Sequence, residues 1–265
     1  MIEEFVVKKS PYQLSGLVSV SKKLHSFLTN KLNNTNNFAN HTLIERIPYG
    51  INLSEKIAKY PEDVLRLIFV GRLEEEQKRI SDVVLAFCDV ATNISGVEIT
   101  ILGDGSAKPK VELILKNNPN LPIKLVGFVD NNKVKEYLLN SHIIVLLSDY
   151  EGLPISLLEG MACGLVPVCL NNTCSGITEL VKHNETGLLV NNRKEDFVAA
   201  IKKLKSNLKL WQKLSKNAHE KIKNEYSTEK MSNLWIDFLT KLNQKYLIKK
   251  PIQKTDSIKF TPGKF

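Results

Sequence analysis

The sequence lacks any run of about 20 apolar residues, which is the length that a helix needs to cross a membrane. It also lacks the features of a secretory signal, because its first residues, MIEEFVVKK, are acidic where a signal is basic, and no long apolar segment follows. We therefore expect a cytoplasmic protein. A G-x-G-x-x-G fingerprint and a P-loop are absent too, so neither of these phosphate-binding loops is available.

Cysteine and histidine are scarce and scattered. The chain has four cysteines and five histidines, and none has the spacing of a zinc or redox motif. We interpret the cysteines as reduced packing residues and the histidines as structural, and we expect no metal ion. His142 is the only histidine that we place near the site described below. The residues are Cys88, Cys163, Cys169 and Cys174, and His25, His41, His142, His183 and His219.

The positive charge of the chain is concentrated toward its end. Residues 191–265 hold 18 Lys and Arg against 7 Asp and Glu, a balance of +11. The whole chain has a net charge of +9, so residues 1–190 carry a balance of −2. A basic surface favours anionic partners such as phospholipid headgroups or phosphorylated substrates. The alternative is a set of lysine-rich helix faces that contact only water.

Short apolar segments alternate with helix-like segments from residue 65 onward. The apolar segments predict strands at 65–71, 97–103, 123–127, 143–148, 165–170 and 187–190. Helical spacing predicts helices between and after them, at 80–92, 107–117, 131–140, 154–163, 175–183 and 194–206. Continuous apolar strands are buried on both faces, and strand–helix alternation is typical of parallel crossovers. We therefore predict an α/β fold with a Rossmann-like, doubly wound parallel sheet and extra C-terminal helices.

The two ends of the chain differ from this pattern. After residue 207 the sequence is only helical, and the last helix carries an apolar stripe that needs a cover: Met231, Leu234, Trp235, Phe238, Leu239 and Leu242. Residues 16–21 predict a strand and residues 22–32 a helix, which is too little for a domain. We expect an appendage and linker at 1–48, a main domain at 49–225, a helix at 226–250 and a flexible tail at 251–265.

The stretch SDYEGLPISLLEG, residues 148–160, lies at the end of a strongly apolar predicted strand. Ligands of open parallel sheets bind at the carboxyl ends of the strands. Pro154 suits the first turn of a helix, whose dipole and free N–H groups near Gly152–Ser156 would hold a phosphate. Glu151 and Glu159 would bind sugar hydroxyls, because carboxylates repel phosphate. The alternative is that both glutamates serve only a helix N-terminus and a solvated face.

Two cations follow the first strand of this series, in the segment VGRLEEEQKRI at residues 70–80. Arg72 and Lys78 could neutralise a diphosphate, Arg72 by a bidentate contact and Lys78 as a point charge. The alternative is a surface cluster in which these cations pair with Glu74, Glu75 and Glu76. The LGDGS segment at 102–106 follows the next strand, although its G-D-G is also ordinary turn chemistry.

Taken together, these motifs resemble the nucleotide-sugar-binding half of the retaining GT-B glycosyltransferases of glycosyltransferase family 4, which includes enzymes of polysaccharide biosynthesis. The resemblance covers residues 43–250 and is carried by IPYGI, VGRL with a following lysine, ITILGDG, KLVGFV, SDYEGLPISLLEGMACGLVPV and ITELVKHNETGLLV. Its most specific element is the spacing of Glu151 and Glu159. The chain departs from many relatives by having Arg79, where they have glycine after the lysine.

The resemblance implies a role for each matching residue. Arg72 and Lys78 would neutralise the donor diphosphate, Glu151 would contact the transferred sugar, and Glu159 would hold the ribose hydroxyls. The donor would bind without a metal, and we expect a UDP-sugar, with a GDP-sugar as the alternative. In a retaining front-face reaction the leaving phosphate assists the acceptor's deprotonation, so electrostatic stabilisation is the main catalytic effect. The other donor-binding residues would be Gly71, Gly103, Gly127, Phe128, Val129, Gly152, Leu153, Pro154 and Ile155.

The main departure from the family is that most of the N-terminal acceptor domain is missing. Only GLVSVSKKLHSFL, residues 16–28, resembles the end of that domain. Closure of a cleft positions the acceptor and excludes water, so we expect this chain alone to be poorly active or inactive and to need a separate acceptor-domain protein. The alternatives are a non-catalytic nucleotide-sugar-binding module or degenerate remnant, and a GT-B epimerase, which the EGLPISLLE pattern disfavours.

A lipid-linked acceptor would account for the basic C-terminal region, because such an acceptor lies at a membrane surface. Lysine-rich segments are attracted to anionic lipid headgroups. We therefore expect the protein to contact the cytoplasmic face of an anionic membrane through its basic C-terminal region. We expect no nucleic-acid partner.

Overall fold

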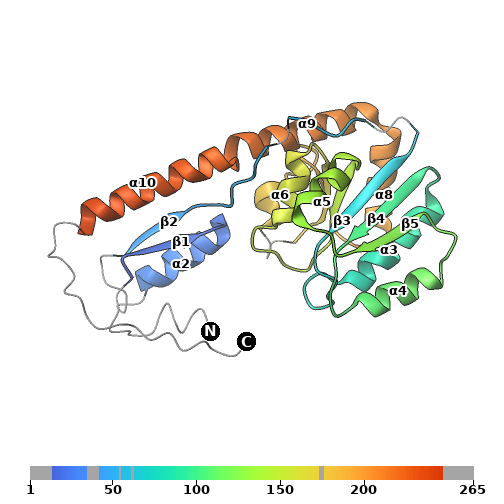
Figure 1. The fold of residues 1–265 in the computed structure, drawn as a ribbon, viewed down its shortest axis with the longest axis horizontal. Coiled ribbons are helices and arrows are strands. Elements are labelled where there is room, and N and C mark those ends of the chain that lie inside the picture. The colour runs from blue at the N-terminus through green and yellow to red at the C-terminus, as the bar shows by residue number, and fades with distance from the viewer. Residues whose placement is uncertain (1–13, 35–41, 54, 61–62, 173–175, 247–265) are drawn as a thin grey trace.

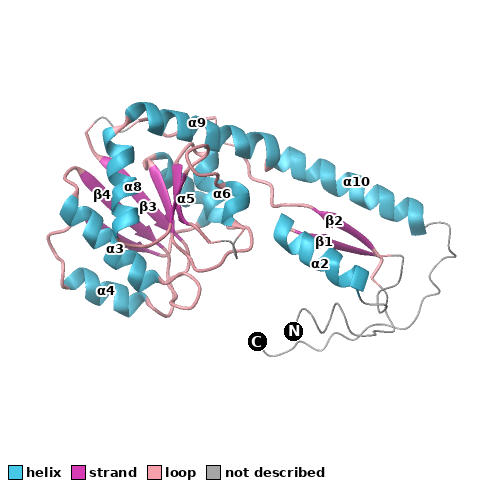
Figure 2. Cartoon of the chain, turned by 180° about the vertical axis from the view of Figure 1, so that it is seen from behind, coloured by secondary structure: helices cyan, strands magenta, loops and turns pink. Residues whose placement is uncertain are grey.

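The computed structural model describes residues 14–34, 42–53, 55–60, 63–172 and 176–246. Within them the chain forms a parallel six-stranded sheet flanked by helices, and a smaller unit with a two-stranded sheet stands beside it (Figure 1). The long last helix runs from the larger unit across the smaller one (Figures 1 and 2). The predicted α/β fold with a doubly wound parallel sheet is confirmed. None of the described helices is long and apolar enough to cross a membrane.

The strands of the large sheet lie in the order β5-β4-β3-β6-β7-β8. Their bounds are β3 Leu65–Val70, β4 Val97–Leu102, β5 Ile123–Gly127, β6 Ile143–Leu146, β7 Val166–Leu170 and β8 Leu188–Val190. The chain builds outward from β3 to β5 and then returns to place β6 on the other side of β3. Loops after β3 and β6 therefore leave the sheet at a topological switch point, where open α/β sheets bind their ligands.

The helices of the large unit lie close to the predicted ranges, with one exception. They are α3 Ile80–Asn93, α4 Lys108–Lys116, α5 Asn131–Leu139, α6 Ile155–Ala162, α7 Ile177–Leu180, α8 Glu195–Ser206 and α9 Leu208–Glu225. The helix predicted at 175–183 contains only the four residues of α7, because the backbone becomes extended at Val181. Helical spacing in so short a segment does not predict where the chain leaves the helix.

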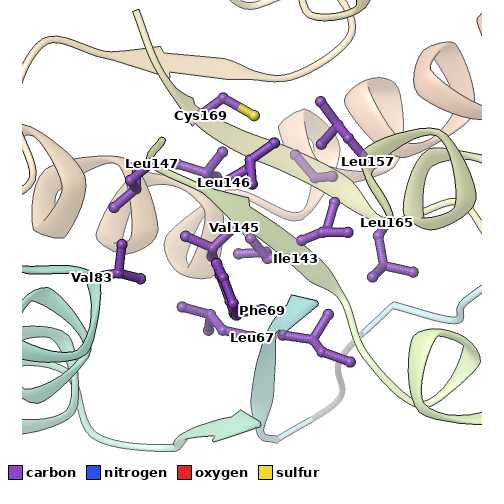
Figure 3. Packing of buried hydrophobic residues seen from close by; sticks show 14 of the residues in the cluster. Leu67, Phe69, Val83, Ile143, Val145, Leu146, Leu147, Leu157, Leu165 and Cys169 are labelled. Atoms are coloured by element: carbon purple, nitrogen blue, oxygen red, sulfur yellow. The ribbon is translucent and has the colours of Figure 1, made fainter. Parts of the chain in front are cut away.

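The core is centred on β3 and β6. All residues of β6 and β7 are buried, as expected for strands that are covered on both faces. Figure 3 shows Leu67 and Phe69 of β3 near Val145 of β6, with Leu157 of α6 nearby. Cys88, Cys163 and Cys169 are free and buried, as predicted, and burial raises the pKa of the Cys163 thiol to about 11. Cys174 lies outside the described residues.

The smaller unit consists of β1 Gly16–Ser19, α2 Lys22–Asn34 and β2 Leu43–Arg46. Strands β1 and β2 pair in parallel, and β2 was not predicted, because LIER is short and half-buried throughout. The last helix, α10 Thr228–Tyr246, covers this pair with Phe238, which is 4% exposed. A Cβ placed on Gly16 would lie 2.6 Å from the Phe238 ring. The predicted apolar stripe is only partly covered, since Trp235 and Leu239 are 38% and 55% exposed.

One buried carboxylate ties the smaller unit to the larger one. Glu179 of α7 forms an ion pair with Arg46 of β2, and its other oxygen accepts the backbone N–H of Lys22 at 2.8 Å. The hydroxyl of Tyr226 donates to Glu179 at 3.3 Å, and its pKa is raised by burial, so it remains a neutral donor. Glu179 thereby orients both β2 and the first turn of α2 toward the large sheet. The tail predicted at 251–265 lies outside the described residues.

Candidate functional site

The loops that follow β3 and β6 meet at the switch point and bring two predicted site residues into contact. Lys78 Nζ donates to Glu151 Oε1 at 2.5 Å. Their side chains are only 10% and 6% exposed, so this is a buried ion pair. The two residues are 73 positions apart in the chain, and only the adjacency of β3 and β6 places them together. The pairing of Lys78 with Glu151 was not among our expectations.

Gln77 completes this cluster and was missed by the sequence analysis. Its side-chain N–H groups donate to Glu151 Oε2 at 3.1 Å and to the carbonyl oxygen of Tyr150 at 2.9 Å. Its Oε1 accepts from Arg72 Nη2 at 3.0 Å. Arg72 also pairs with Glu74 at 2.9 Å, as the surface-cluster alternative supposed, yet its side chain stays 69% exposed. The only sequence signal for Gln77 was its place beside Lys78 in a loop that follows a buried strand.

The loop after β6 is held in place by three other segments. The N–H of Asp149 donates to the carbonyl oxygen of Gln77 at 2.9 Å. Arg193, after β8, donates to the carbonyl oxygen of Leu147 at 2.9 Å and forms an ion pair with the Asp149 carboxylate. The Asn172 amide donates to the Asp149 carbonyl oxygen. These contacts hold in place the loop that carries Glu151.

The amino end of α6 opens onto this loop. Pro154 is the extended residue just before the helix, not its first helical residue as predicted, and no side chain caps this end. A Cβ added to Gly152 would have no atom within 4 Å, so the loop is open there. Gly176 helps to hold this loop, since its N–H donates to the Glu151 carbonyl oxygen at 2.8 Å. Uncapped N–H groups and the helix dipole make this end suitable for an anion.

Three of the predicted glycines lie together at the ends of β3, β4 and β5. Gly103 has φ +143°, and a Cβ there would lie 1.8 Å from the carbonyl oxygen of Gly71. Its N–H donates to the Gly127 carbonyl oxygen at 2.8 Å. Only glycine allows this close approach, so the three backbones form one continuous surface. Beyond it, the Phe128 side chain is 73% exposed and Val129 is half-buried.

Glu159 borders a separate hollow of about 480 Å³. The hollow lies between α6, the start of α5 and the segment 50–52, and Ile155 also borders it. Burial raises the pKa of Glu159, because its surroundings disfavour the ionised form. A carboxylate kept at such a cost, beside the polar side chains of Asn131 and Asn132, is suited to accept hydrogen bonds from hydroxyl groups of a ligand.

The pKa of Glu159 predicts that Glu159→Gln stabilises the protein. A raised folded-state pKa means that the ionised form lowers stability above the unfolded-state value, which is about 4.3 for glutamate. The variant should therefore melt at a higher temperature than the wild type at pH 7, and the gain should vanish as the pH falls below about 4. Thermal melts at several pH values test this, with exposed Glu136→Gln as control. A lower melting temperature at pH 7 would contradict the expectation.

Arg79, which stands where many relatives have glycine, has a backbone conformation that suits glycine. It lies just before α3 in the left-handed conformation, with φ 51°, which glycine adopts without strain. Its guanidinium pairs with Asp82 at 2.7 Å and lies 3.8 Å from Asp149. The backbone at this position thus adopts the conformation that glycine favours, although the residue is arginine.

The expectation that His142 lies near the site is wrong. His142 precedes β6, so it stands at the amino edge of the sheet, whereas Glu151 follows the carboxyl end of the same strand. Its Nδ1 accepts the N–H of Arg66 at 2.9 Å, and burial lowers its pKa to about 4, with Arg66 adding to the effect. A hollow of about 900 Å³ lies at this amino edge, but none of the predicted site residues borders it.

Comparisons with known proteins show the family of the chain. The family model of the glycosyl transferases group 1 matches residues 52–221. N-acetyl-alpha-D-glucosaminyl L-malate synthase of Bacillus anthracis is 34% identical over 189 residues, 69% of this chain and 45% of the relative. UDP-Gal:alpha-D-GlcNAc-diphosphoundecaprenol alpha-1,3-galactosyltransferase of Escherichia coli is 26% identical over 205 residues, 74% of this chain and 52% of the relative. The chain thus spans about half the length of these relatives.

Solved structures show the same fold. A mutant of S. aureus TarM, in complex with fondaparinux, alpha-GlcNAc-glycerol and UDP, superposes with a TM-score of 0.72 at 21% identity, over 84% of this chain and 43% of that one. Anabaena HepE, in complex with UDP and glucose, has a TM-score of 0.70 at 14% identity, over 85% and 63%. The family match covers more than half of the sequence, including the cluster around Lys78 and Glu151, and the chain therefore belongs to the group 1 glycosyl transferases.

Proposed function

We propose that this chain is the donor-binding half of a glycosyltransferase of family 4 that uses a nucleoside-diphosphate sugar. The observation that carries the proposal is the meeting of the open amino end of α6 with Arg72 and Lys78 at the switch point. Backbone N–H groups and two cations suit a diphosphate. The hollow beside Glu159 would take the ribose, with the carboxylate on its hydroxyls.

UDP is the nucleotide that we propose, with GDP as the alternative. The Escherichia coli relative is named for a UDP-sugar, and the TarM and HepE structures contain UDP. Each is only a similar protein, so these facts support the proposal without identifying the base. The surface formed by Gly71, Gly103 and Gly127, with Phe128 and Val129 beyond it, would lie along the base and ribose.

The proposed reaction breaks the bond between the sugar's anomeric carbon and the diphosphate oxygen. Negative charge then develops on the leaving diphosphate, and the exposed guanidinium of Arg72, together with Lys78, would stabilise it. Both Glu151 oxygens are already engaged, by Lys78 and by Gln77. A carboxylate held in this way is a poor nucleophile, which supports a retaining front-face route in which the leaving phosphate assists the acceptor's deprotonation.

The acceptor would be bound by a further domain, either on another part of the polypeptide or on a separate protein. Within its described residues the smaller unit has a sheet of two strands, which is too small to be a stable domain by itself. The partly exposed stripe of α10, with Trp235 and Leu239, would contact that domain. The basic C-terminal region would hold the assembly on an anionic membrane surface where a lipid-linked acceptor lies.

Calorimetric titration of the purified chain with UDP, GDP and ADP and their sugar conjugates tests the donor site. We expect UDP or a UDP-sugar to bind, and Arg72→Ala to weaken binding about tenfold or more, because hydrogen bonds to charged groups contribute about 1.5–3 kcal/mol. The matched control is Arg66→Ala, which removes an exposed guanidinium from the other end of β3. Equal weakening by both variants, or no binding of any nucleotide, would contradict the proposal.

The alternative is a nucleotide-sugar-binding module that does not transfer. The two functions share the donor site, so binding alone does not separate them. Transfer of sugar after addition of candidate acceptor-domain proteins would support the enzyme, and binding without transfer in every combination would support the module.

A further inference from the structure

We infer that Gln77 is a positioning residue that aims Arg72 at the donor diphosphate and keeps Glu151 from capturing it. The inference rests on the proposed donor site. Gln77 contacts both the exposed cation and the buried pair: its Oε1 accepts from Arg72 at 3.0 Å, and its Nε2 donates to Glu151 at 3.1 Å. The residue is therefore the link between the two parts of the cluster.

The chemistry of the amide explains why this position suits glutamine. A neutral amide has a donor end and an acceptor end. The donor end of Gln77 faces two oxygens, those of Tyr150 and Glu151, and the acceptor end faces the Arg72 guanidinium. The reverse orientation would place oxygen against the Glu151 carboxylate. Both ends are thus determined by their partners.

The position of Gln77 also joins the two loops of the switch point. Its backbone carbonyl oxygen accepts the N–H of Asp149 at 2.9 Å, while its side chain reaches Tyr150 and Glu151. Glu151 receives one charged partner, Lys78, and one neutral partner, Gln77, so its charge is balanced without Arg72. Arg72 pairs with Glu74 instead of Glu151, and its side chain remains 69% exposed, so an anionic ligand can reach it.

Replacing the amide with a carboxyl group tests this role through pH. In Gln77→Glu the ionised side chain would pair with Arg72 and repel Glu151, adding negative charge where the diphosphate binds. When protonated, the same side chain again has a donor and an acceptor, like the amide. The charged groups on its own loop are Arg72, Glu74 and Lys78. Across the switch point lie Glu151 and Asp149, and Asp149 is accompanied by its partners Arg79 and Arg193.

We expect Gln77→Glu to bind UDP-glucose about tenfold to a hundredfold more weakly than the wild type at pH 8. The deficit should shrink as the pH falls toward 4, because protonation, which Glu151 favours and Arg72 opposes, returns a donor and an acceptor to the side chain. UDP-glucose is the appropriate probe, since its diphosphate has no protonation step in this range. Gln77→Leu has neither donor nor acceptor, so its deficit should not depend on pH. Gln212→Glu, an exposed amide-to-carboxyl change on α9, should bind normally.

The outcomes separate this inference from the proposed function. If the wild type binds UDP-glucose and Gln77→Glu binds equally well at every pH, the inference is wrong and the donor site stands. A deficit in Gln77→Glu that does not change between pH 8 and pH 4 would show a merely structural role and would also overturn it. If the wild type and Gln212→Glu both fail to bind any nucleotide, the proposed function fails and the inference fails with it.

Discussion

Lys78→Met is expected to destabilise the protein by about 3–5 kcal/mol, because it leaves the Glu151 carboxylate buried without its cation. Both side chains are at most 10% exposed, so water does not replace the lost partner. The Gln77 amide still donates to Glu151, but a neutral donor does not balance the charge. Chemical denaturation at pH 7 measures the loss, and UDP binding under the proposed function should be lost with it.

A second substitution separates stability from binding. In Lys78→Met combined with Glu151→Leu, the buried ion pair becomes an apolar pair, an exchange that is often neutral or even stabilising. We therefore expect stability to recover most of the loss while UDP affinity stays low, because the cation is still missing. A single variant as stable as the wild type would show that water reaches Glu151. Normal UDP binding by the double variant would show that Lys78 does not belong to the donor site.

Gly176→Ala should destabilise the protein and Gly152→Ala should not, although the two glycines lie in contact with each other. A Cβ on Gly152 would meet nothing within 4 Å, whereas a Cβ on Gly176 would lie 1.7 Å from the Gly152 carbonyl oxygen. Gly176→Ala must separate α7 from the loop, at a cost of about 1–3 kcal/mol or more. Gly152→Ala should leave stability within about 1 kcal/mol of the wild type.

At Gly152 the substitution should weaken UDP binding, although it leaves stability nearly unchanged. If a phosphate approaches the backbone there, the added methyl group takes its place, and UDP affinity should fall about tenfold to a hundredfold in a protein of unchanged stability. Thermal melts and calorimetric titration of both variants provide the two measurements. Normal UDP binding by Gly152→Ala would mean that the ligand does not use this backbone and that the amino end of α6 is not the phosphate site.

Much of the fold could be predicted because its signals are local. The apolar runs Leu65–Val70 and Ile143–Leu146 are strands in the structure, and the intervening helices lie within one or two residues of their predicted bounds. The weaker signals failed for physical reasons: β2 is short and half-buried, and α7 ends after four residues because the chain turns away at Val181. His142 was misplaced although chain direction alone puts a residue before β6 at the amino edge.

The residues suited to this chemistry are evident from local sequence, since Arg72, Lys78, Glu151 and Glu159 stand at strand ends and in a helix that periodicity defines. Which of them touch depends on the tertiary structure. Lys78 meets Glu151, and Gln77 links both loops, because β6 returns to the side of β3. That strand order follows from burying the whole core, which involves residues far apart in the chain. Local periodicity depends on neighbours a few positions away, so it contains no information about such partners.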